Sequence, residues 1–149
     1  MVKRFLYILS VFLLFANTAI AETLYVQITP QEIIRTSDKK IQPGDTFNFI
    51  VIEDVTYSGK TYLKKDDIIN GLLIEKSENG TFGKKAQLYF EQFTSGNLKL
   101  NGVIYQSGNS RVRDLTYEFF GFALLSQWLR GAEVKMVPYK NIYTLELET

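Results

Sequence analysis

The chain lacks two residue types that carry much of protein chemistry: its 149 residues include no cysteine and no histidine. Without cysteine there is no disulfide, no thiolate nucleophile and no cysteine-ligated zinc or iron–sulfur centre. Without histidine the commonest general base and the commonest metal ligand are missing. Carboxylates, hydroxyls, lysine, arginine and the backbone remain. No pattern among them predicts a catalytic residue, a metal site or a cofactor.

The first 21 residues differ in composition from the rest. Lys3 and Arg4 precede an uncharged, mostly apolar run at residues 5–16, and Ala19 and Ala21 form an A-x-A site. This order is typical of a secretory signal peptide, and the run is shorter than the ~20 residues that span a bilayer. We expect cleavage after Ala21 and a single exported domain over residues 22–149, in the periplasm or cell envelope of a bacterium. An uncleaved N-terminal anchor is the alternative.

The rest of the chain is close to neutral. The whole chain has 17 basic and 16 acidic residues, and removal of the leader lowers the basic count to 15. Such a balance provides no field that draws in nucleic acid or an anionic membrane. Hydrophobic residues make up 46% of the chain, which excludes wholesale disorder. We therefore expect a folded domain without a nucleic-acid partner.

The residues after the leader predict a mainly β domain. In the clearest strand, at residues 46–57, Phe47, Phe49 and Val51 alternate with residues of the opposite face. Ser58-Gly59 and Asn79-Gly80 favour tight hairpin turns, the second of type I′. Further strands are expected at 23–28, 32–36, 60–64, 67–76, 85–93, 98–106, 133–137 and 142–148. Many short strands predict a small antiparallel β-barrel or sandwich, and the pattern does not choose between them.

Residues 111–130 break this pattern, because their apolar positions recur every three or four residues, as in a helix. The segment is apolar around nearly its whole circumference, whereas a surface helix has a polar stripe. Either it plugs the barrel as a core helix, or it contacts a membrane or a partner. For the second case the predicted interface residues are Phe119, Phe120, Phe122, Leu125, Trp128 and Leu129.

Residues 44–107 resemble the C-terminal domain of TrbI-type outer-channel subunits of type IV secretion systems. The similar positions are Gly44, Asp54-Val55, the spacing from Leu63 to Gly71, Gly83 and Ala86-Gln87-Leu88. The chain departs from the family pattern at Lys64, where the family has proline, and at Asp66, where it has glycine. The resemblance implies a barrel with a helical insertion late in the domain, in a place similar to residues 111–130.

These observations favour a non-enzymatic envelope module that binds or assembles through a sheet edge or the apolar helix. Its partner would be an envelope protein or a second copy, with membrane contact possible through the helix. A carrier of a small apolar ligand inside the barrel is an alternative. A cell-wall glycan hydrolase would need two convergent acids, but the neighbours Glu53-Asp54 and Asp66-Asp67 point to opposite faces of a strand.

Overall fold

The computed structural model describes residues 23–80, 84–108 and 131–147. Within these ranges the chain forms strands and no helix, so the helix predicted at residues 111–130 lies outside the described residues. The strands are β1 (Leu24–Pro30), β2 (Ile34–Arg35), β3 (Thr46–Val51), β4 (Val55–Tyr57), β5 (Lys60–Leu63), β6 (Ile68–Ser77), β7 (Gln87–Ser95), β8 (Leu98–Asn101), β9 (Ile104–Ser107), β10 (Lys135–Met136) and β11 (Tyr143–Leu147).

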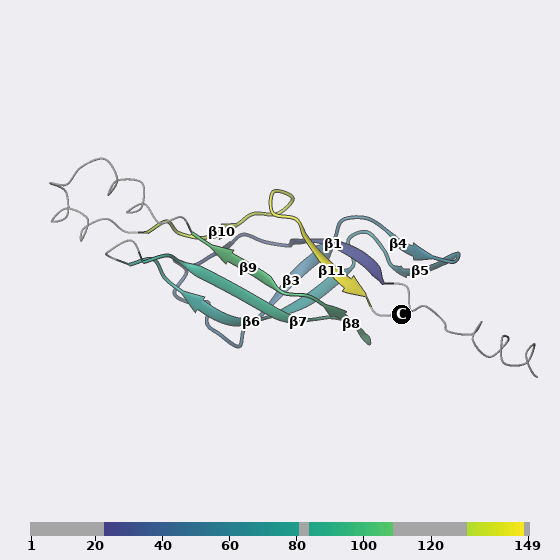
Figure 1. The fold of residues 1–149 in the computed structure, drawn as a ribbon, viewed down its shortest axis with the longest axis horizontal. Helices are drawn as coiled ribbons and strands as arrows, with labels where there is room; N and C mark the ends of the chain where they lie inside the picture. Colours follow the sequence, from purple (N-terminus) through teal and green to yellow (C-terminus); the bar gives the residue numbers. More distant parts are fainter. Residues whose placement is uncertain (1–22, 81–83, 109–130, 148–149) are drawn as a thin grey trace, which may run out of the picture.

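Six of these strands close into an antiparallel barrel (Figure 1). Their order is β6-β3-β1-β11-β8-β7, and β7 pairs back onto β6 to complete the ring. The choice between barrel and sandwich is therefore settled in favour of the barrel. The first and last barrel strands in the chain, β1 and β11, lie side by side, with Val26 opposite Leu145.

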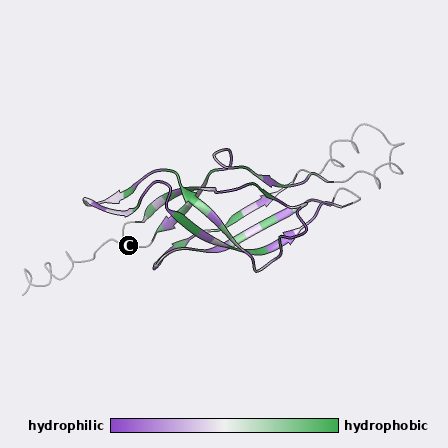
Figure 2. Ribbon diagram, turned by 180° about the vertical axis from the view of Figure 1, so that it is seen from behind, coloured by the Kyte–Doolittle hydropathy of each residue, from purple (hydrophilic) through white to green (hydrophobic). Residues whose placement is uncertain are grey.

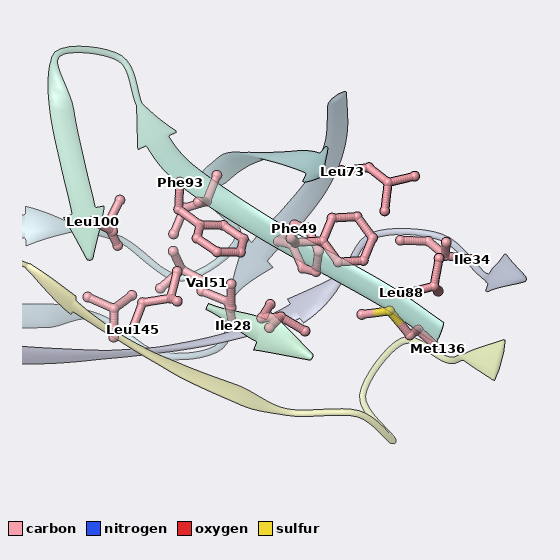
Figure 3. Close-up of a cluster of buried hydrophobic side chains, with 14 of the residues drawn as sticks. Ile28, Ile34, Phe49, Val51, Leu73, Leu88, Phe93, Leu100, Met136 and Leu145 are labelled. Carbon is pink, nitrogen blue, oxygen red and sulfur yellow. The ribbon is translucent and has the colours of Figure 1, made fainter. Parts of the chain in front are cut away.

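Strand alternation fills the barrel with side chains. Hydrophobic and hydrophilic positions alternate along the strands (Figure 2), and Phe49, Phe90 and Phe93 are fully buried. Phe49 packs edge-on against each of the other two rings, with centroid distances of 5.5 and 5.6 Å. The close-up in Figure 3 shows this core. A barrel of this strand number has room for its own side chains and little else.

A two-stranded ribbon, β2 with β10, covers one end of the core. Ile34 and Met136 pair across the ribbon, and both lie beside Leu88 (Figure 3). Thr36 fixes the ribbon, since its backbone N–H donates to Val134 O at 3.1 Å and its hydroxyl oxygen accepts from Val134 N at 3.1 Å. Residues about a hundred positions apart are thus joined by backbone pairing.

The prediction of a single strand at residues 46–57 is wrong, because the structure has two strands there. β3 ends at Val51, and β4 belongs to a separate hairpin with β5 at one end of the molecule (Figure 1). The break occurs near Asp54, whose carboxylate accepts a hydrogen bond from Lys65 N at 2.7 Å. The predicted Ser58-Gly59 turn is confirmed, with φ of 49° and 77° as a type I′ turn requires.

The strand predicted at residues 98–106 is also divided, at Gly102. This glycine has a φ of 143°, and a Cβ there would lie 2.7 Å from Leu145 Cδ2. The chain bends at this point, so β8 pairs with both β7 and β11, whereas β9 pairs with β7 alone. Within the described residues, the bend leaves β9 paired on one side only.

The type I′ turn predicted at Asn79-Gly80 is wrong. Neither residue has a positive φ, and the connection between β6 and β7 runs through residues 78–86. The Asn79 side chain is used elsewhere, because its Nδ2 donates to Gly131 O at 2.9 Å. Asn79 thus contacts a residue distant in the sequence and does not form the predicted type I′ turn.

Candidate functional site

The chain before residues 109–130 and the chain after them meet where Gly108 contacts Ala132. A Cβ built on Gly108 would lie only 2.0 Å from Ala132 O, so the two backbones are in direct contact. Only glycine permits this approach, since any side chain would collide with the carbonyl. The described chain therefore stops at Gly108 and resumes at Gly131 at the same place on the barrel.

Hydrogen bonds tie both flanks to neighbouring strands. Gly108 N donates to Ala86 O at 2.9 Å, and Gly131 N donates to Gly80 O at 3.2 Å. Asn79 Nδ2 donates to Gly131 O, so both backbone polar groups of Gly131 are bound by the connection between β6 and β7. The described part of the attachment point thus consists of Asn79, Gly80 and Ala86 bound to the two flanks.

All six predicted interface residues, from Phe119 to Leu129, lie outside the described residues. The structure places their attachment point and leaves their role a prediction. Among the described residues, no helix has the length and apolarity needed to cross a membrane.

The free side of β9 is a second candidate site. Because Gly108 N bonds to Ala86 O, the alternation of an antiparallel ladder makes Leu88–Gln106 and Phe90–Ile104 the hydrogen-bonded pairs. The N–H and C=O groups of Tyr105 and Ser107 then point away from β7. In the described ranges no strand pairs with this side.

A shallow pocket of about 240 Å³ lies at the end of this free side. Residues 106–108 line it on one side, and residues 132–135 line it on the other. The lining side chains are mainly polar, and β9 itself carries no charge and no proline. Proteins commonly protect edge strands with just those residues, so β9 is an unprotected edge.

The pocket has two cations beside it. Lys135 lines the pocket and pairs directly across the ribbon with Arg35, and both residues are exposed. Among the described residues neither side chain forms an ion pair. Like charges opposite each other on two strands are unfavourable. The one acid in the lining, Glu133, accepts a hydrogen bond from Ser37 Oγ.

Tyr143, at the start of β11, lies near Gln106 of β9 and near Asn141. Its hydroxyl oxygen is buried and makes no hydrogen bond of regular geometry in the described part of the chain. Burial raises the pKa of Tyr143 to about 12, against smaller opposing effects from the side chains of Asn141 and Gln106. The phenol therefore stays protonated at physiological pH and offers a polar group beside Gln106.

One carboxylate of each acidic pair accepts a hydrogen bond from a backbone N–H. Asp54 accepts from Lys65 N and Asp67 Oδ2 accepts from Lys64 N, each at 2.7 Å. Backbone N–H groups bound by a nearby carboxylate are typical of tight turns. No group of three or more possible metal-ligating acids occurs among the described residues. The geometry thus gives these carboxylates a structural task.

The positions behind the family resemblance fall on ordinary barrel features. Gly44, with a φ of 99°, precedes β3, and Asp54-Val55 opens the β4–β5 hairpin. Gly71 lies within β6, and Ala86-Gln87-Leu88 leads into β7. Gly83 lies outside the described residues.

Comparison of the chain with protein-family models, with curated proteins and with solved structures finds no match in any of the three.

Sequence reasoning missed the β9 edge and its pocket. It treated residues 98–106 as one strand, although Gly102 was a visible signal for a bend. It also could not place Arg35 beside Lys135, because nothing local in the sequence predicts that pairing.

Proposed function

We propose that this chain is a non-enzymatic module of the bacterial cell envelope, in which a closed barrel presents the apolar segment 109–130 to a partner. The contact between Gly108 and Ala132 carries the proposal. Because both flanks are fixed at one end of the barrel, the segment is an insertion into a domain that is otherwise continuous. The proposal assigns its apolar residues to contact with a partner, a second copy or a membrane.

The filled interior supports a binding role outside the barrel. Phe49, Phe90 and Phe93 are fully buried among other core side chains, and they occupy the space that an apolar ligand would need. The carboxylates of Asp54 and Asp67 are bound to backbone N–H groups, which likewise favours a binding role over hydrolysis. The resemblance to outer-channel barrel domains belongs to this proposal, as does export through the leader at residues 1–21.

The test replaces two of the predicted interface residues. The double variant Phe120→Ser with Phe122→Ser should lose association while the barrel remains folded. The chain is expressed with its own leader and purified from the periplasm. Association is measured by sedimentation velocity and by co-sedimentation with phosphatidylethanolamine–phosphatidylglycerol vesicles and with host envelope fragments.

The matched control is Tyr25→Ser with Ile142→Ser. These two large residues are 65% and 52% exposed on the barrel, so the control removes a similar apolar surface elsewhere. It should keep full association. If the Phe120 and Phe122 changes unfold the domain, or leave association intact, the segment is not the contact and the proposal fails.

A further inference from the structure

We infer that the free side of β9 binds an extended acidic peptide segment, which adds to the barrel sheet as one more strand. This inference deepens the proposed binding role and uses a surface distinct from residues 109–130. Four backbone groups, the N–H and C=O of Tyr105 and Ser107, point away from β7 with regular strand spacing. Strand addition uses such groups for affinity.

The geometry favours a single extended segment over a folded second copy. Residues 132–135 stand on the far side of the pocket from residues 106–108, and the backbones touch at Gly108 and Ala132. The sheet of another barrel would collide with this wall as it approached in the plane of β9. A lone strand can enter the space between the two walls.

Charge specifies the occupant further. Arg35 and Lys135 face each other across the ribbon beside the pocket, and no described carboxylate pairs with either. Glu133, also in the lining, accepts a hydrogen bond from Ser37 Oγ. Two cations and one carboxylate give this region a net positive charge. An acidic residue at the end of the bound strand would relieve the repulsion between the two cations.

Two labelled peptides serve as probes, Thr-Val-Thr-Val-Thr-Val-Asp-Asp and the same sequence ending in Lys-Lys. Fluorescence anisotropy measures binding to the full exported chain, and ¹⁵N spectra report which amides shift. The acidic peptide should bind about tenfold more tightly than the basic one, and the amide signals of Tyr105 and Ser107 should move. Absence of binding by both peptides overturns the inference.

The decisive variant is Tyr105→Pro, which removes an N–H on the free side and leaves the bonds to β7 in place. It should abolish peptide binding, whereas the matched control Tyr105→Thr keeps the N–H and should keep binding. If Tyr105→Pro fails to fold, Ser107→Pro removes the equivalent donor. Binding that survives the proline variants contradicts strand addition.

Lys135→Glu gives a readout independent of backbone changes, because it should reverse the preference between the two peptides. If the chain instead dimerises through Tyr105 and ignores both peptides, the occupant is a second copy and the inference is wrong. The Phe120 and Phe122 variant should bind the acidic peptide normally. This variant distinguishes a failure of peptide binding at β9 from a failure of the proposed contact through Phe120 and Phe122.

Discussion

At the scale of single residues, small side chains set the packing of the barrel. Gly71 faces the core within β6, where a Cβ would lie 2.5 Å from Phe93 Cε1 and 3.0 Å from Phe49 Cε2. The absence of a side chain at this position makes room for the edge-on packing of the two rings.

Gly71→Ala should therefore destabilise the domain by about 1–3 kcal/mol through overpacking. Urea unfolding followed by tyrosine fluorescence measures the change. The control is Gly80→Ala, where the nearest atoms, at 3.3 Å, belong to the flexible side chain of Lys84. Equal stabilities for the two variants would show that the rings near Gly71 can move aside at no cost.

At the scale of elements, one buried threonine joins β1 to the turn at residues 137–141. Thr29 Oγ1 accepts from Tyr139 N at 2.7 Å and donates to Asn141 O at 2.9 Å. The turn closes on itself, because Asn141 N donates to Val137 O at 3.0 Å. This connection holds the chain in place between β10 and β11.

Thr29→Val keeps the shape of the side chain but removes both hydrogen bonds, so it should cost about 1–3 kcal/mol. Faster amide exchange at Tyr139 should accompany the loss, since that donor would no longer have its acceptor. Thr144→Val, on the exposed face of β11, is the control and should be nearly neutral. A neutral Thr29→Val would show that the turn is fixed by other contacts.

The sequence predicts individual strands better than their partners. Alternation at residues 46–51 and 86–91 correctly assigns Phe49, Leu88 and Phe90 to the interior, because the period of a strand is local. The division of residues 46–57 and 98–106 depends on which neighbour each half finds. Those pairings are distant in the sequence, and periodicity alone carries no information about them.

The candidate sites are less predictable for the same reason. A strand break at Gly108 and the end of the predicted helix at Gly131 are visible as local signals, but the meeting of these two parts of the chain in space is not. The contact of Gly108 with Ala132 and the pairing of Arg35 with Lys135 both depend on closure of the whole barrel. The role of the six predicted apolar residues stays a prediction, since they lie outside the described residues.

At the scale of the whole molecule, six of the described strands form a closed barrel, and the chain on either side of residues 109–130 meets at Gly108 and Ala132. The core residues found in the described strands form one continuous cluster (Figure 3). The flanks of the insertion are fixed by bonds from Ala86, Gly80 and Asn79. Shortening a flexible loop between fixed ends lowers the entropy cost of closing it by about 0.6 kcal/mol for each halving of its length, or about 2 kcal/mol for a sevenfold change.

The most direct test of this account is the stability of the barrel without its insertion. Residues 109–130 are replaced by Gly-Ser-Gly between Gly108 and Gly131, and urea unfolding is compared with that of the same chain with the segment in place. We expect one cooperative transition, with a free energy of unfolding within about 2 kcal/mol of the original. Loss of the cooperative transition would show that the segment is part of the core and would contradict the account.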